Sequence, residues 1–211
     1  MTHRPVGLVA ILRGVTPPEA VDVAAAVLGA GFDAVEVPLN SPDPLASVRR
    51  IREAAGPDAR VGAGTVLTPD DVRRAADAGA SLVVSPNTRP DVVAETVRLG
   101  LESYPGAATP TEAFAALDAG ATAVKLFPAA AVGVAGLRAW ASVLPAGTAL
   151  VPVGGVDATT LGEWARAGAA GAGLGTSLYR PGDTAETVAV RAAELVRVWA
   201  EHTNHSPRVA R

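Results

Sequence analysis

Residues 119–128 read AGATAVKLFP, and the start of this stretch is the pattern that decides the fold. A small residue, a glycine and an apolar residue precede a short apolar run. The same pattern recurs at glycines 31, 79, 100, 120 and 168, which are 48, 21, 20 and 48 residues apart. The two long gaps each equal two units of 24. A period of 20 to 24 residues is that of a helix, a turn, a strand and a second turn.

Each repeat also has the local chemistry of such a unit. Its glycine suits the left-handed position that ends a helix, and a strand rich in Val, Leu and Ala follows. Helix starts are predicted at Thr16, Thr68 and Thr109. At each of them the threonine caps free amides, a proline fits the first turn and an acidic residue favours the helix N-terminus.

The repeats predict eight strands alternating with eight helices. The predicted strands cover residues 6–13, 33–39, 60–66, 81–86, 101–105, 122–127, 149–153 and 170–175. The predicted helices cover residues 16–29, 43–55, 69–78, 89–99, 110–119, 134–143, 157–167 and 184–200. Apolar strands alternating with helices require a parallel sheet. Eight units favour an α/β fold of the (β/α)8 TIM-barrel type, a single domain over residues 1–200, with a disordered tail at 201–211. An open doubly wound sheet is the alternative.

Composition narrows the class of function. The net charge of -3 gives no reason to expect a nucleic-acid partner. No apolar run is long enough to span a membrane and no signal peptide is recognised, so we expect a cytoplasmic enzyme without a membrane partner. Cysteine is absent, and His3, His202 and His205 lie in terminal segments where a solvated tail is expected. Thiol catalysis, Ser-His-Asp catalysis, a metal site and a cofactor are therefore not expected.

The lysine within AVKLFP is the only lysine in the chain, beside 17 arginines. Alternation along the sixth strand places Val124 and Leu126 against the helices, and Ala123, Lys125 and Phe127 inside the barrel. Arginine is the better residue for a purely structural ion pair. A primary amine can lose its proton and attack a carbonyl, and burial or a neighbouring arginine would lower its pKa.

The same alternation brings three more polar groups inside. It places Glu36 inward on the second strand and Arg13 at the top of the first. On the third strand it predicts an inward set of Val61, Ala63 and Thr65. The four polar groups would converge at the carboxyl ends of the strands, where barrel enzymes have their sites. A buried ion pair that locks the barrel remains the structural alternative.

Glycine-rich loops follow the last two strands. Gly154 and Gly155 come after the seventh strand, and Gly175, Thr176 and Ser177 come after the eighth. Backbone amides in such loops bind phosphate, and these are the loops that commonly do so in barrels. Tight turns alone are the other explanation. The sequence has neither GxGxxG nor a P-loop, which disfavours a nucleotide.

Eight motifs between about residues 9 and 197 read AILRGVTPPEA, GFDAVEVPLNSP, GAGTVL, VVSPN, YPGAATPTEA, AVKLFPA, VPVGGV and GAGLGTSLYR. On these motifs the sequence resembles the 2-keto-3-deoxy-6-phospho-sugar-acid aldolases, and among them most closely the 2-dehydro-3-deoxy-6-phosphogalactonate aldolase branch. The resemblance covers nearly the whole chain, and the motifs together are specific where the short glycine pieces alone are not.

The resemblance implies a class I aldolase that cleaves a phosphorylated keto acid to pyruvate and D-glyceraldehyde 3-phosphate. Lys125 would form an imine with the C2 ketone, and Glu36 would be the acid/base. Arg13 and Thr65 would hold the carboxylate. The rest of the implied site comprises Pro86 and Phe127 around the pocket, and Gly154, Gly155, Gly175, Thr176 and Ser177 at the phosphate. The family commonly forms trimers, so a homotrimer is expected.

Some alternatives stay open. The gluconate-type aldolases carry an arginine where this chain has Asn40, which favours the galactonate type. A 2-dehydro-3-deoxy-6-phosphogluconate aldolase or a dual-substrate enzyme is the alternative. Rivals from other classes are a phosphosugar epimerase or isomerase with Lys125 as an electrostatic anchor, and a non-catalytic phosphometabolite-binding barrel. Trp140 and Trp164 on outer helices mark either an interface or packing against the barrel.

Overall fold

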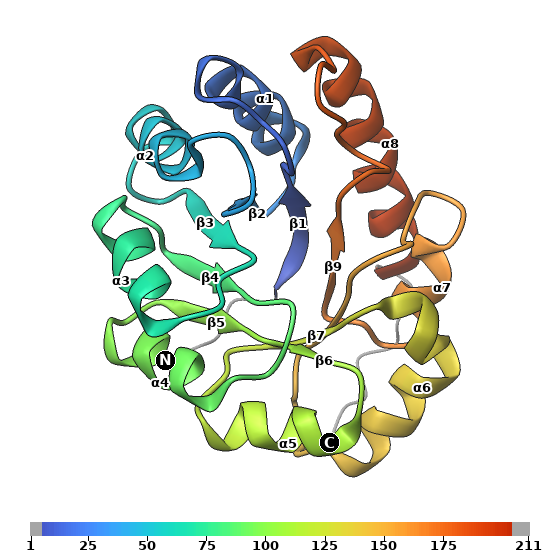
Figure 1. Cartoon of the computed structure of the whole chain (residues 1–211). Coiled ribbons are helices and arrows are strands. Elements are labelled where there is room, and N and C mark those ends of the chain that lie inside the picture. Colours follow the sequence, from blue (N-terminus) through green and yellow to red (C-terminus); the bar gives the residue numbers. More distant parts are fainter. Residues whose placement is uncertain (1–5, 204–211) are drawn as a thin grey trace.

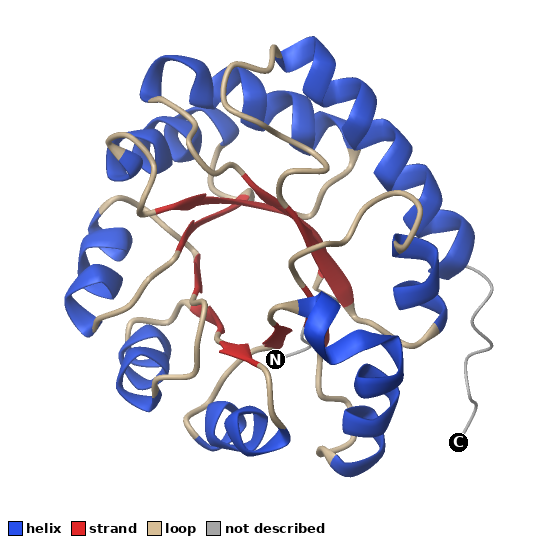
Figure 2. Ribbon diagram, turned by 45° about the vertical axis from the view of Figure 1, so that its right-hand side comes forward, coloured by secondary structure: helices blue, strands red, loops and turns tan. Residues whose placement is uncertain are grey.

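The computed structural model describes residues 6–203, in which parallel strands form a ring surrounded by helices (Figure 1 and Figure 2). The strands are β1 (Gly7–Ile11), β2 (Ala34–Pro38), β3 (Arg60–Gly64), β4 (Leu82–Val84), β5 (Glu102–Tyr104), β6 (Gly106–Ala107), β7 (Val124–Leu126), β8 (Leu150–Pro152) and β9 (Gly171–Leu174). The helices are α1 (Pro17–Ala30), α2 (Pro44–Ala55), α3 (Pro69–Asp77), α4 (Pro90–Arg98), α5 (Pro110–Asp118), α6 (Ala129–Val143), α7 (Leu161–Arg166) and α8 (Ala185–Thr203).

The ring of strands is closed. Six strands pair in the order β5-β4-β3-β2-β1-β9, and three pair in the order β6-β7-β8. A parallel bridge between Val153 and Gly173 joins β8 to β9. On the other side, the backbone N–H of Lys125 donates to the carbonyl of Pro105 at 2.9 Å. The predicted barrel is confirmed, and the open doubly wound sheet is excluded.

The predicted fifth strand, 101–105, is β5, and Pro105 separates it from β6, which the prediction did not include. Proline has no N–H to give to the ladder. β5 therefore pairs only with β4, and β6 pairs with β7 on the other side. Within residues 6–203, nine short strands accompany the eight helices.

The helix boundaries follow the predicted caps, with one exception. The helix-ending glycines 31, 79, 100, 120 and 168 all have positive φ, as predicted. The side chain of Thr68 accepts from the amide of Asp71, and Thr109 forms a capping box with Glu112. Thr16 caps no amide, so that prediction is wrong. Its hydroxyl instead donates to Glu19 at 2.9 Å, and Glu19 also accepts from the hydroxyl of Tyr179.

Three helices differ in extent from the prediction. α6 begins at Ala129 rather than 134 and is kinked at Gly133, where φ is 71°. α7 begins only at Leu161 because the carboxylate of Asp157 accepts from the two amides that precede the helix, and so forms a turn. α8 continues to Thr203, three residues into the predicted tail. Residues 204–211 of that tail lie outside the described residues.

His202 is one of these last helical residues and is not in a solvated tail. It is half-buried in the final turn of α8, and its Nδ1 lies 2.8 Å from the carbonyl oxygen of Val198. Within residues 6–203, no helix combines the length and the apolarity that crossing a bilayer requires.

Two apolar clusters make up the core. One lies between strands and helices and includes Leu8, Val35 and Leu126. The other fills the barrel interior and includes Val9, Ala34 and Ala123. Trp140 and Trp164 are 6% and 5% exposed and belong to the first cluster. Of the two explanations for these tryptophans, packing against the barrel is correct.

Candidate active site

The lysine lies inside the barrel, in the middle of β7. Its neighbours Val124 and Leu126 pack into the helix-facing core, so the alternation of the strand turns Lys125 into the interior. Only 7% of Lys125 is exposed. Its Nζ lies 4.5 Å from the centroid of the Phe127 ring, two residues further along the chain. The expectation of a buried amine is confirmed.

Glu36 faces the same interior from β2. It is 2% exposed, whereas its neighbours Val35 and Val37 pack against the helices. Its Oε2 is buried without a hydrogen-bond partner among the described residues. An unpartnered buried carboxylate oxygen is costly, and in native structures it commonly marks a catalytic group or a position taken by water. Glu36 is therefore free to accept a proton or a hydrogen bond from a bound molecule.

A glycine makes room for this carboxylate. A Cβ added to Gly64, at the end of β3, would overlap the carboxyl group of Glu36. The neighbouring strand therefore has no side chain where the glutamate lies.

A small cavity of about 10 Å³ joins the two groups, with room for about one water molecule. Its lining residues are Val9, Ile11, Glu36, Val84, Tyr104, Lys125, Val151, Val153 and Gly173. The residues that line it are apolar apart from Glu36, Lys125 and Tyr104, and the hydroxyl of Tyr104 is hydrogen-bonded to Glu102, so few polar groups weaken the interaction between the amine and the carboxylate.

Burial shifts both groups towards neutrality. It raises the pKa of Glu36 to about 7, although the positive charges of Lys125 and Arg13 oppose this shift. Burial likewise lowers the pKa of Lys125. The charge of Glu36 opposes that shift, and the charge of Arg13 adds to it. Glu36 can therefore give or take a proton near neutral pH, and the lowered pKa of Lys125 favours the unprotonated amine, which is a nucleophile.

The mouth of the barrel carries a guanidinium. Arg13 is exposed after β1, and its Nη2 lies 3.5 Å from Oγ1 of Thr65. Its Nη1 donates to Oδ1 of Asn40, which lies two residues after the end of β2. Thr65 and Asn40 together orient the guanidinium at the entrance to the interior.

Thr65 reaches this position in a way that the sequence did not predict. Val61 and Ala63 belong to the helix-facing core, so the predicted inward set on β3 is wrong. The residues of opposite parity are Gly62 and Gly64, which leave interior space for Leu82 and Glu36. Thr65 nevertheless meets Arg13 because its own φ is 56°, a left-handed value that breaks the alternation of the strand. Residues other than glycine that have such a strained backbone are found mainly at functional sites.

The glycine-rich loops form a larger cavity at the same mouth. Its volume is about 400 Å³. Its lining includes the predicted residues Arg13, Phe127, Gly154, Gly155, Gly175 and Thr176. Gly154 and Gly155 have φ values of 93° and 79°, in the left-handed region. Their amides therefore take orientations that other residues reach only with strain.

Besides Thr65, which contacts Arg13, two predicted site residues line neither this cavity nor the small one. The hydroxyl of Ser177 donates to the carbonyl of Val156 at 2.9 Å, and Ser177 lines an adjoining cavity of about 390 Å³. Pro86 is half-buried after β4, with its carbonyl close to Gly106. Neither is among the described residues that line the 400 Å³ cavity or the small one.

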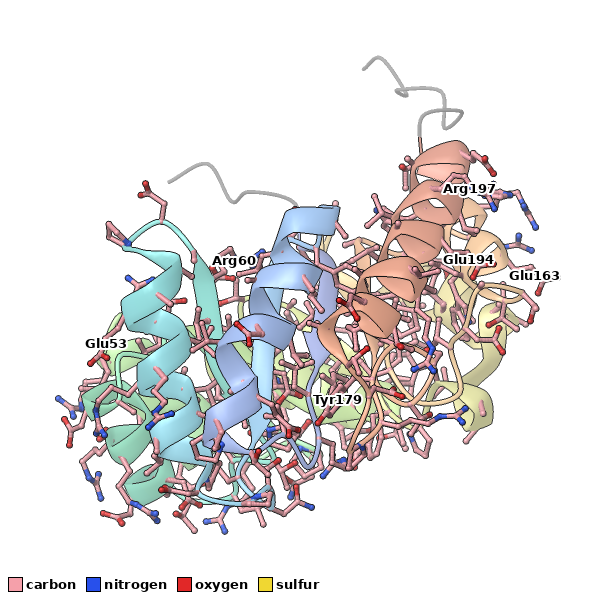
Figure 3. All side chains as sticks on the ribbon, turned by 90° about the horizontal axis from the view of Figure 1, so that it is seen from above. Glu53, Arg60, Glu163, Tyr179, Glu194 and Arg197 are labelled. Carbon is pink, nitrogen blue, oxygen red and sulfur yellow. The ribbon has the colours of Figure 1, made fainter. Side chains whose placement is uncertain are left out.

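Sequence reasoning missed three polar side chains among the residues that line these cavities. Tyr179 and Arg180 follow the last glycine loop and line the 400 Å³ cavity. The SLYR motif was the signal for both. Tyr104 lines the small cavity, and its spacing of two from Glu102 on one strand was the signal for an inward side chain. Figure 3 shows Tyr179 and Arg60 towards opposite ends of the barrel.

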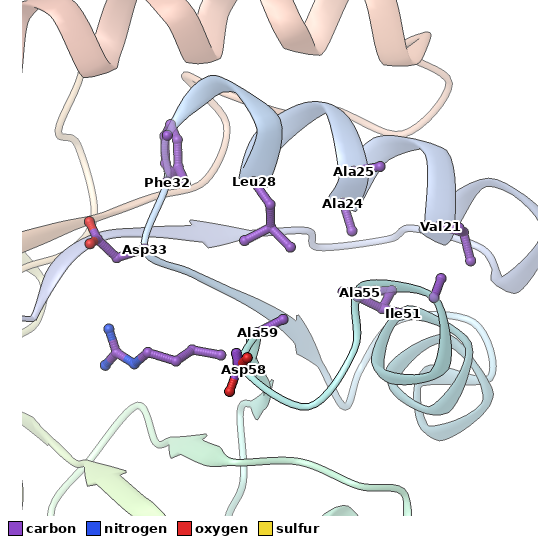
Figure 4. A pocket seen from close by; sticks show the side chains of 13 residues that line it. Val21, Ala24, Ala25, Leu28, Phe32, Asp33, Ile51, Ala55, Asp58 and Ala59 are labelled. Carbon is purple, nitrogen blue, oxygen red and sulfur yellow. The ribbon is translucent and has the colours of Figure 1, made fainter.

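A cavity of about 530 Å³ lies away from this chemistry, on the outside of the barrel between α1 and α2 (Figure 4). Among the residues that line it, only Asp33, Asp58 and Arg60 are charged. Volume alone does not identify the active site here, because the buried amine and carboxylate lie at the smaller cavities.

Comparison with known proteins agrees with this geometry. The model of a family described as "KDPG and KHG aldolase" matches residues 2–191. The chain belongs to this family.

Individual proteins extend the comparison. The 2-dehydro-3-deoxy-6-phosphogalactonate aldolase of Escherichia coli (strain K12) is 48% identical over 92% of this chain and 95% of its own length. A solved structure described as native KDPGal superposes with a TM-score of 0.93 at 46% identity, covering 96% of this chain and 98% of that one. A cage designed by fusing symmetric oligomeric domains gives a TM-score of 0.92 at 47% identity, over 95% of this chain and 74% of that one. The resemblance of the sequence to the phospho-sugar-acid aldolases is thereby confirmed.

The raised pKa of Glu36 predicts the pH profile of this aldolase. Because that pKa is about 7, the carboxylate form predominates only above about pH 7. As the pH falls through this value, the free enzyme loses its base, and kcat/KM should fall about tenfold per pH unit. A pH–rate profile measures this, and the Glu36→Gln variant should lack this acidic limb. An acidic limb near pH 4.5 in the wild type would contradict the prediction.

Gly64→Ala should impair this aldolase by displacing Glu36. The added methyl group overlaps the carboxyl group, which must move away from the cavity. A displacement of about 1 Å at a reacting group costs about 10²-fold in rate, and kcat measures this. Gly29→Ala is the matched control, because nothing lies within 4 Å of an added Cβ there. It should keep full activity and gain about 0.5–1 kcal/mol in unfolding free energy. Equal activity of the two variants would contradict the prediction.

Proposed function

We propose that this protein is a class I aldolase that cleaves 2-dehydro-3-deoxy-6-phosphogalactonate to pyruvate and D-glyceraldehyde 3-phosphate. The observation that carries the proposal is the chain's only lysine, buried with Glu36 at the small cavity. Ile11, Val153 and Gly173 line both this cavity and the larger one formed by the two glycine-rich loops. The Escherichia coli relative that is 48% identical has this activity in its name. Asn40, where gluconate-type enzymes have arginine, also supports the galactonate substrate.

In the proposed reaction the neutral amine of Lys125 attacks the C2 ketone. Glu36 in its protonated form donates the proton with which the carbinolamine loses water, and a protonated imine remains. Glu36 takes the proton of the C4 hydroxyl through a water molecule, and the C3–C4 bond breaks. The electron pair of that bond moves into the imine, which becomes a neutral enamine, and D-glyceraldehyde 3-phosphate leaves. Protonation of C3 and hydrolysis of the imine then release pyruvate and restore the amine.

The other residues hold the two ends of the substrate. The guanidinium of Arg13 and the hydroxyl of Thr65 bind the carboxylate next to C2, and Phe127 shapes the pocket around the pyruvate half. The phosphate lies against the amides of Gly154, Gly155 and Gly175 and the side chains of Thr176 and Ser177. Backbone amides and hydroxyl groups, which donate hydrogen bonds, suit a phosphate dianion.

The substrate is tested with the two C4 epimers. Purified protein is given the galactonate or the gluconate substrate, and pyruvate is measured with a coupled lactate dehydrogenase. We expect kcat/KM to be at least about tenfold higher for the galactonate substrate, since a built polar contact to one hydroxyl discriminates strongly. Equal values would favour the dual-substrate enzyme. Release of no pyruvate from either epimer would overturn the proposal and favour a binding barrel.

The covalent step is tested by reduction. With pyruvate and borohydride, the imine at Lys125 becomes a stable secondary amine, and peptide mass spectrometry locates it. An unmodified Lys125 would favour the rival epimerase or isomerase, in which the lysine acts only through its charge.

We further propose a homotrimer in the cytoplasm that needs no metal or other cofactor. The designed cage built from symmetric oligomeric domains, to which this chain is 47% identical, supports an oligomer. Light scattering coupled to size-exclusion chromatography gives the molar mass, and a monomer or dimer would contradict the trimer. Undiminished turnover after treatment with a chelator is expected, and its loss would contradict the absence of a metal.

A further inference from the structure

An ion pair lies at the end of the barrel opposite the active-site mouth. Arg60 is the first residue of β3, and Glu102 is the first residue of β5. The guanidinium donates from Nε to Oε1 at 3.0 Å and from Nη2 to Oε2 at 2.6 Å. Nη1 also donates to the carbonyl of Val6 at 3.0 Å, so the guanidinium ties the beginning of β1 to β3 and β5. The Arg60 side chain is only 11% exposed.

Tyr104 connects this ion pair to the active site. It lies two residues after Glu102 on β5, so both side chains have the same parity. Its hydroxyl donates to Oε2 of Glu102 at 2.6 Å and accepts from Nη2 of Arg60. The residue is 2% exposed and belongs to the interior apolar cluster. It also lines the small cavity that contains Lys125 and Glu36.

The residue therefore extends from the reacting groups to the far end of the barrel. The two glycines of β3 leave interior space at this level, which Leu82 and Glu36 fill from neighbouring strands. A small residue at position 104 would open a route from the end carrying Arg60 to the cavity of the amine. Water on that route would solvate the charged amine and favour its protonation.

We propose that Tyr104 is a positioning residue for the reacting amine, whose ring, clamped by Glu102 and Arg60, closes the barrel beneath Lys125 and keeps water from reaching the amine from that end. This inference rests on the proposed function, because the exclusion of water matters only if the amine of Lys125 must be unprotonated to react. The two clamping groups hold the phenol from different strands, so the ring cannot swing aside without breaking both contacts.

The chain's composition gives a direct test. Lys125 is the only lysine, so trace acetylation with acetic anhydride reports on a single side-chain amine, read by peptide mass spectrometry. The acetylation rate is proportional to the fraction of Lys125 that is unprotonated. The pH at which the rate reaches half of its maximum therefore gives the pKa of the amine, independently of any aldolase activity. Glu36 from β2 and Arg13 from the end of β1 also face the amine, and every variant keeps both.

Tyr104→Ala should move the pH midpoint of Lys125 acetylation upward by about one unit, which is about a tenfold lower rate near neutral pH. Phe32→Ala is the matched control: it removes a buried aromatic from the helix-facing cluster, and the midpoint should stay in place. If Tyr104→Ala does not fold, Tyr104→Val is used, which also leaves much of the space of the ring unfilled, and its midpoint should move in the same direction. An unchanged midpoint, or an equal shift in Phe32→Ala, overturns the proposal.

Borohydride trapping separates this result from the proposed function. If wild-type Lys125 forms the pyruvate adduct and the Tyr104 variants keep the wild-type acetylation midpoint, only the role of Tyr104 fails. If the midpoint moves but no variant and no wild-type protein forms an adduct, the role of Tyr104 stands and the aldolase mechanism fails.

Discussion

Lys125→Arg should lower kcat for aldol cleavage by about 10⁴-fold or more, the scale seen when a covalent nucleophile is removed. Arginine keeps the positive charge and much of the stem length, but a guanidinium stays protonated and forms no imine. The coupled pyruvate assay measures the loss. This substitution is more informative than removal of the charge, because it separates nucleophilicity from electrostatics.

The control for Lys125→Arg is Arg49→Met, which removes an exposed cation from α2. It should leave kcat unchanged. Circular dichroism and thermal unfolding show whether Lys125→Arg keeps the fold, and Lys125→Met serves if the larger guanidinium does not fit. Retention of a tenth or more of wild-type turnover in Lys125→Arg would sink the imine mechanism and favour the epimerase-type role of an anchoring charge.

Glu36→Gln should lower kcat by about 10²–10⁴-fold, the usual contribution of a general acid–base group. Glutamine has nearly the same shape, but it cannot take the proton of the C4 hydroxyl. The imine with pyruvate should still form at Lys125, because the nucleophile is intact, although more slowly. Stopped-flow or quenched single turnovers measure the loss of the cleavage step.

The matched control for Glu36→Gln is Glu53→Gln on the exposed surface of α2 (Figure 3), where kcat should not change.

The pH dependence of unfolding gives a second measurement on Glu36→Gln. Because the pKa of Glu36 is raised in the folded protein to about 7, its contribution to stability is fully present below pH 4.5 and is lost as the pH rises through 7. That part of the pH dependence of unfolding should vanish in Glu36→Gln. Full turnover of the variant would contradict the acid–base role.

The sequence was enough to identify Lys125 and Glu36, because side chains along a strand point alternately to its two faces. The parity argument correctly placed Lys125 on β7 and Glu36 on β2, each between residues that pack against helices. It failed on β3, where glycines at 62 and 64 face the interior and a left-handed Thr65 ends the strand. A parity argument assumes regular strands with side chains on both faces, and β3 has neither at its end.

The sequence by itself determined the number of helix–strand units, the positions of most helix ends and the single amine inside the barrel. These features depend on local chemistry: periodic glycines, capping residues and the alternation of apolar side chains. Only the tertiary structure decided which groups meet. Asn40 orients Arg13, Gly64 makes room for Glu36, and Tyr104 connects the small cavity to Arg60. Such contacts join residues 27 to 44 positions apart, or a side chain to a space, and depend on how the closed ring aligns neighbouring strands.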